Sequence, residues 1–155
     1  MQTIVFPIIR FLHDLFTAVW IGGLVLMALV ILPALKKSPQ VKEPRAAMLA
    51  IQSRLKTFAI ISMVGLALTG MLLSNREPEF SSLFSFGTKY NAVLSVKHLL
   101  MILMVALAML RLWLNKKQDK QHQPKIEKYS AAVLFLNAIV GVVVLYLSAF
   151  ISGML

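Results

Sequence analysis

The chain has 155 residues, of which 59% are hydrophobic and only 14% are charged, and it contains no cysteine. This balance is far from that of a soluble domain, and the missing thiols exclude disulfides, thiolate metal sites and cysteine nucleophiles. The formal net charge of +10 would favour nucleic acid as a partner of a soluble protein. Here the basic residues gather beside long apolar segments, so we expect a membrane protein in contact with lipid and no nucleic-acid partner.

Four apolar segments are each long enough to cross about 30 Å of hydrocarbon. In chain order they cover about residues 4–32, 57–73, 91–114 and 130–154. Helices in lipid still need packing partners for their polar positions. We therefore expect an all-α fold, a single integral membrane four-helix bundle over residues 1–155. Pro33, directly after the first segment, is expected to end that helix.

The distribution of basic residues predicts how the chain crosses the membrane. The connections after the first and third apolar segments are rich in Lys and Arg, whereas the charges of the connection between the second and third cancel. By the positive-inside rule the two basic connections face the cytoplasm. The sequence thus predicts a multi-pass protein of the inner or plasma membrane with both termini outside, an N-out/C-out arrangement.

Two histidines inside the apolar segments are the main candidates for a functional site, since ionisable residues within the membrane are costly. His13 and His98 lie about 13 Å and about 10 Å from the outer ends of their segments, at about 1.5 Å per residue. Two imidazoles at similar depth suit the axial positions of a haem iron. We predict one haem b with bis-His ligation in the outer half of the membrane, in contact with a quinol or a redox protein partner.

Other residues of the predicted haem site follow from depth and size. Cationic side chains are expected at the propionates, small residues where the macrocycle meets a helix, and polar groups in the same layer as the histidines. The cationic candidates are Arg10 and Lys97, the small ones are Gly22 and Gly23, and the polar ones are Thr69 and Tyr146.

Copper is an alternative to haem on the same residues. Met101 follows His98 at i+3, and thioethers together with imidazoles suit Cu(I). A copper site would therefore use His13, His98 and Met101. A structural alternative also stays open, because a histidine in a membrane helix can simply bond to a Ser, Thr or Asn of a neighbouring helix.

Three runs of the sequence, in order over about residues 11–114, resemble the membrane domain of the CopD copper-resistance family. They are HDLFTAVWIGGLVLMALVILPAL, SRLKTFAIISMVGLALTG and GTKYNAVLSVKHLLMILMVALAMLRLWL. The resemblance implies copper handling at the membrane, and because members of that family are often longer, it implies a partner or a homodimer. The positions to which it points are His13, Trp20, Gly22, Gly23, Pro33, Arg54, Thr69, Gly70, Tyr90 and Lys97.

The predicted architecture is also distantly similar to the HemJ type of protoporphyrinogen oxidase. That resemblance rests on a histidine in the first helix and a lysine in the third, here His13 and Lys97, and it implies haem b binding. It makes a membrane oxidoreductase a third possibility. This chain departs from the pattern at His98, which follows the lysine and supplies a second imidazole.

Overall fold

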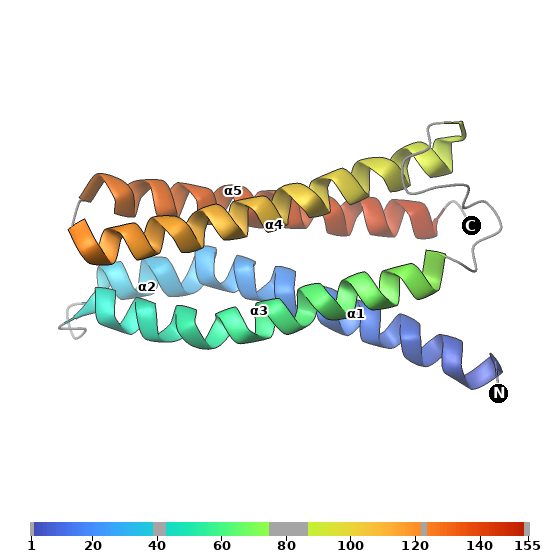
Figure 1. The fold of residues 1–155 in the computed structure, drawn as a ribbon, viewed down its shortest axis with the longest axis horizontal. Coiled ribbons are helices and arrows are strands. Elements are labelled where there is room, and N and C mark those ends of the chain that lie inside the picture. The colour runs from blue at the N-terminus through green and yellow to red at the C-terminus, as the bar shows by residue number, and fades with distance from the viewer. Residues whose placement is uncertain (1, 39–42, 75–86, 122–123, 154–155) are drawn as a thin grey trace. The chain divides into compact units, whose positions relative to one another are not determined.

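The computed structural model describes residues 2–38, 43–74, 87–121 and 124–153. In these ranges every regular element is helical (Figure 1). Four segments are long and apolar enough to cross a membrane, so the prediction of an all-α, multi-pass membrane protein is confirmed. The side of the membrane on which the termini lie stays a prediction. In chain order the elements are α1 (Gln2–Leu26), the π-helical turn η1 (Met27–Ile31), α2 (Leu32–Lys37), α3 (Pro44–Ser74), α4 (Lys89–Gln121) and α5 (Pro124–Ser152).

The first span continues through Pro33, so the prediction that this proline ends the helix is wrong. A proline ring clashes with the carbonyl group four residues earlier, here that of Leu29. Leu29 lies within η1, whose wider turn comes directly before α2. The π turn therefore accommodates the proline, and the span runs from α1 to Lys37 without a break.

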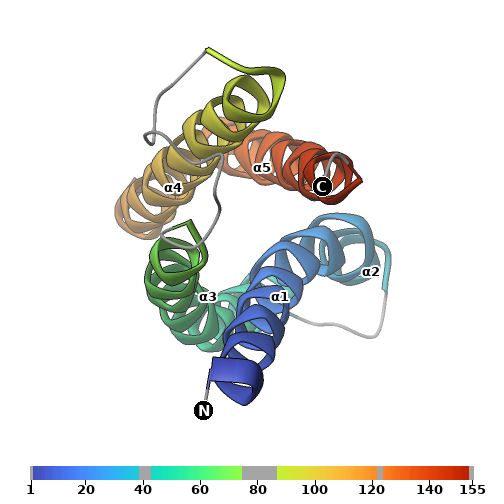
Figure 2. The same ribbon diagram turned by 90° about the vertical axis from the view of Figure 1, so that its right-hand side faces the viewer.

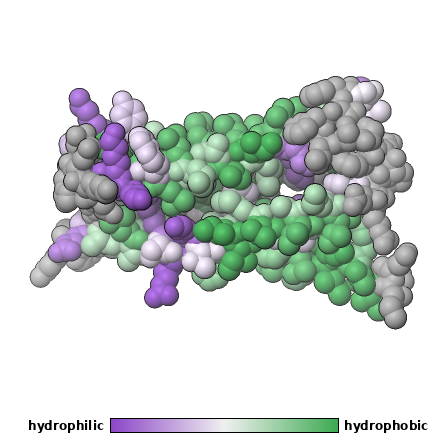
Figure 3. Space-filling model, in the orientation of Figure 1, coloured by the Kyte–Doolittle hydropathy of each residue, from purple (hydrophilic) through white to green (hydrophobic). Residues whose placement is uncertain are grey.

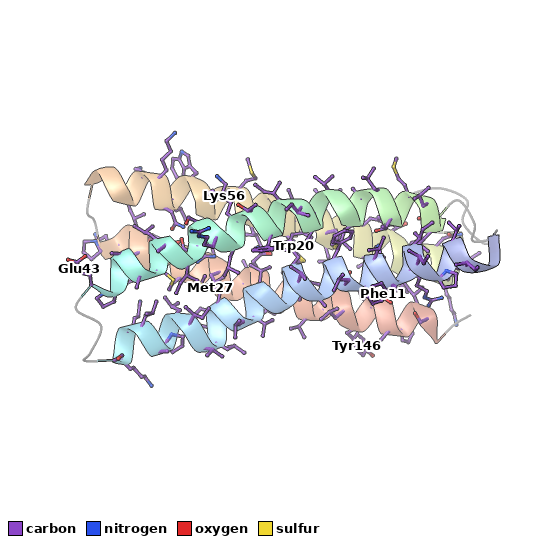
Figure 4. All side chains as sticks on the ribbon, turned by 90° about the horizontal axis from the view of Figure 1, so that it is seen from below. Phe11, Trp20, Met27, Glu43, Lys56 and Tyr146 are labelled. Atoms are coloured by element: carbon purple, nitrogen blue, oxygen red, sulfur yellow. The ribbon has the colours of Figure 1, made fainter. Side chains whose placement is uncertain are left out.

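The helices also extend well beyond the apolar segments predicted for them. α3 and α5 begin at Pro44 and Pro124, where proline is favoured because the first helical position needs no N–H donor. α3 includes Arg54 and Lys56, which the sequence placed in the basic connection before the second apolar segment. Figure 4 labels Lys56 on this helix. Arg and Lys are good helix formers. The change from charged to apolar residues therefore did not mark where α3 begins.

The helices form two compact units, Met1–Pro78 and Glu79–Leu155. In the first unit α1 packs against α3, and in the second α4 packs against α5. The two long helices of each unit run in opposite directions (Figures 1 and 2). Whether residues 1–155 form a single domain stays a prediction.

The core of the second unit follows a regular stripe of α5. From Ile126 to Val144 a buried residue recurs there every three or four positions, the spacing of one face of a packed helix, and Ile151 follows two turns later. On the face visible in Figure 3, hydrophobic side chains cover the middle of each unit, and hydrophilic ones gather toward the end where its two long helices are joined. The stripe of α5 contains Ile126, Ser130, Leu134, Asn137, Gly141, Val144 and Ile151.

Candidate functional site

His13 is held in a defined orientation by a hydrogen bond between α1 and α3. Its Nδ1 lies 2.9 Å from the hydroxyl oxygen of Thr69, and that hydroxyl donates its own hydrogen to the carbonyl oxygen of Gly65 at 2.7 Å. The hydroxyl oxygen therefore accepts from the imidazole, so Nδ1 carries the hydrogen. A neutral ring in this tautomer has its lone pair on Nε2.

Close packing of α1 against α3 brings His13 and Thr69 together. Gly65 lies one turn before Thr69 on α3, and Phe16 lies one turn after His13 on α1. A Cβ atom at position 65 would overlap the ring of Phe16, whereas one at Gly70 would lie 3.6 Å from Cε1 of His13, an ordinary contact. Small residues allow helices in lipid to approach closely, so Gly65 sets the helix spacing that the hydrogen bond requires.

His98 of α4 adopts the same tautomer through a contact within its own helix. Its Nδ1 lies 2.8 Å from the carbonyl oxygen of Leu94. A carbonyl can only accept, so Nδ1 donates and the lone pair of the neutral ring is on Nε2. The imidazole is half-buried, as is Met101 one turn later, and Met104 a further turn along is 0% exposed. Imidazole and thioether donors thus follow one another along α4.

Two buried polar residues near the start of α4 were missed by the sequence reasoning. Asn91 is 4% exposed and Ser95 is 0% exposed, and the hydroxyl of Ser95 donates to the carbonyl oxygen of Asn91 at 2.8 Å. The hydroxyl oxygen of Thr88 accepts from the backbone N–H of Asn91 at 3.2 Å and so caps the helix. Positions 91, 95 and 98 have the i, i+4, i+7 spacing of one helix face. This spacing in the sequence could have shown that Asn91 and Ser95 lie on the same face as His98.

Comparison with known proteins places the chain in a family. A family model described as copper resistance protein D (CopD) matches residues 49–151, well over half of the chain. The chain belongs to the CopD family. No curated protein and no solved structure matches it. The resemblance inferred from the sequence is thereby confirmed at the level of the family, whereas the similarity to HemJ-type oxidases stays a prediction.

The residues matched to the CopD model cover one part of the candidate site. Thr69, Lys97, His98 and Met101 lie within residues 49–151. His13 lies outside this range, and a functional role for it stays a prediction that rests on the sequence motif. His13 and His98 also belong to different units, and their joint ligation of one iron stays a prediction.

The described side chains of this CopD protein include imidazoles and thioethers, two kinds of metal donor. No group of three or more His, Asp or Glu residues with metal-binding proximity occurs among the described residues. Thioethers can complement a histidine, and they suit soft ions such as Cu(I). His98, Met101 and Met104 along α4 are thus donors of types that Cu(I) prefers.

The remaining predicted site residues lie in contrasting surroundings. Trp20, in the middle of the first span, is 3% exposed, whereas Tyr146 is 67% exposed (Figure 4). The ring of Tyr146 stacks on Phe150 with centroids 6.4 Å apart. Cofactor contacts by these residues stay predictions. Arg10 and Gly22 are exposed, Gly23 and Lys97 are half-buried, and a Cβ atom at Gly22 or Gly23 would meet nothing within 4 Å.

Proposed function

We propose that this chain is a copper-handling membrane protein that binds Cu(I) as its cargo through imidazole and thioether donors. The observation that carries the proposal is the CopD match over residues 49–151. It favours copper over the haem-based electron transfer that was the first hypothesis from the sequence, because no comparison supports haem binding.

The contacts along α4 support a specific pair of donors. His98 and Met101 are three residues apart, and side chains at that spacing are neighbours on a helix surface. The bond from Nδ1 of His98 to the Leu94 carbonyl oxygen fixes the ring and directs the lone pair to Nε2, as the outer contacts of metal-binding histidines commonly do. We infer that Nε2 of His98 and the thioether of Met101 bind the same Cu(I) ion.

The test is an anaerobic titration of the detergent-purified protein with Cu(I) in competition with a coloured Cu(I) chelator. We expect stoichiometric binding, and a loss of affinity of at least about tenfold in both His98→Ala and Met101→Leu, since even the outer partners of a metal ligand are worth about 10–100-fold. Met109→Leu is the matched control, because Met109 lies on the same helix and is 64% exposed. Equal affinities of the three variants would refute the assigned ligands.

Absorption spectra of the oxidised and dithionite-reduced protein separate copper from haem. The proposal predicts a colourless protein as purified. A Soret band with sharp reduced α and β bands, lost in both His13→Ala and His98→Ala, would instead support the bis-His haem hypothesis.

A further inference from the structure

Arg111 of α4 is a cation without a counterion among the described residues. It lies between Leu110 and Leu112 in an apolar part of the helix. Its Nε is buried, and no described residue accepts a hydrogen bond from it. No described carboxylate pairs with the guanidinium either. Glu127 is the one acidic residue of α4 and α5 whose side chain is described, and it lies in the first turn of α5.

Arg111 is half-buried with an unbonded Nε, and an anionic ligand would satisfy its guanidinium. Removing a charge from water is expensive unless it is paired and hydrogen-bonded. Arginine offers five N–H donors in a planar fork that matches the oxygens of a carboxylate or a phosphate in pairs. The described residues supply no such oxygen to the Nε of Arg111, and a ligand from outside these residues would supply it.

The end of the helix pair that contains Arg111 has the composition of a membrane interface. Trp113 is 57% exposed and Tyr129 is 65% exposed, and these two residue types are enriched at the level of lipid headgroups. The ammonium group of Lys117 lies 5.2 Å from the centre of the Trp113 ring. Four exposed lysines lie at the same end of the helix pair, namely Lys116, Lys117, Lys125 and Lys128. Together with the half-buried Arg111 we call them the α4–α5 basic end.

We propose that Arg111 binds the phosphate of an anionic phospholipid, with the lysines of the α4–α5 basic end holding the headgroup. Lys116 lies five residues beyond Arg111, or about 7.5 Å along the helix axis. The long arginine side chain can extend toward the headgroup level over that distance. The lysines favour a headgroup with net negative charge, because they repel the ammonium group of a zwitterionic lipid.

Native mass spectrometry and thermal unfolding of the detergent-purified full chain test this proposal. The probes are phosphatidylglycerol, phosphatidylcholine of the same acyl chains, and inorganic phosphate. We expect the wild type to bind phosphatidylglycerol at least tenfold more tightly than phosphatidylcholine, with a higher unfolding temperature. Arg111→Gln should lose this preference, and Arg111→Lys should keep only part of it, because lysine retains the charge but not the fork.

The matched control is Lys56→Gln, which removes one exposed cation from α3 and should leave the lipid preference unchanged. Circular dichroism of each variant establishes that it is folded, and the Arg111→Lys variant provides a second measurement should Arg111→Gln not fold. Equal binding of the two lipids by the wild type would overturn the proposal, as would an unchanged preference in folded Arg111→Gln. Stabilisation by inorganic phosphate equal to that by phosphatidylglycerol would refute the lipid as the ligand and identify a soluble anion.

Discussion

Replacing Gly65 by alanine tests whether this glycine sets the spacing of α1 and α3. A Cβ atom there would overlap the ring of Phe16, whereas one at Gly22 would meet nothing within 4 Å. Inserting a methyl group into a well-packed site costs about 1–3 kcal/mol. Alanine also gains up to about 1 kcal/mol over glycine from helix propensity. This gain is common to both positions, so Gly65→Ala should be less stable than Gly22→Ala by about 1–3 kcal/mol.

The assay is unfolding by sodium dodecyl sulfate in mixed micelles, followed by circular dichroism. Gly70→Ala completes the series, because its Cβ atom would make only an ordinary contact of 3.6 Å with His13, and its stability should lie between those of the other two variants. Adding Phe16→Leu to Gly65→Ala should recover part of the loss, since the smaller side chain leaves room for the methyl group. Equal stabilities of Gly65→Ala and Gly22→Ala would refute the close approach of the helices at this point.

Two further substitutions test individual buried hydrogen bonds in the same unfolding assay. Thr69→Val removes the acceptor of the His13 Nδ1–H and should cost about 0.5–1.5 kcal/mol, whereas Thr69→Ser, which keeps the hydroxyl, should cost less; equal losses would mean that the hydroxyl does not hold the imidazole. Asn137→Leu should change stability by less than about 1 kcal/mol, because the amide nitrogen makes only a 3.3 Å bond to the Met104 carbonyl while its oxygen accepts none from the described residues. Asn137→Asp buries an uncompensated charge and should cost about 3 kcal/mol or more, so a leucine variant as unstable as the aspartate would contradict this account.

The number of spans followed from the sequence, but their ends did not. Long apolar runs predict spans because no unpaired backbone is tolerated in lipid. The same argument says nothing about where a helix stops once it leaves the hydrocarbon. Pro44 and Pro124 begin helices that continue the spans outward, and the π turn at Met27–Ile31 carries the first span past Pro33. These are local backbone effects that hydropathy does not encode.

Counting residues gave the depth of side chains in the candidate site, but not their direction. Each residue of a helix adds about 1.5 Å of depth, and the estimate placed His13 and Thr69 in one layer, where they are hydrogen-bonded. The same estimate added Tyr146, a residue that is 67% exposed. Asn91 and Ser95 were missed because the sequence did not show that their side chains point into the buried face of α4. A single polar residue in an apolar helix becomes informative only when the buried face of that helix is known.

The two metal hypotheses place different demands on the fold, even though both use Nε2 of a histidine whose Nδ1–H is held by a protein oxygen. A bis-His haem requires His13 and His98, and therefore donors from both units. The proposed Cu(I) pair of His98 and Met101 requires α4 alone, where one turn of helix already makes the two side chains neighbours. α4 also lies entirely within the stretch matched to CopD, whereas α1 lies outside it. Copper is thus the simpler hypothesis, because its ligands and its family evidence coincide on one helix.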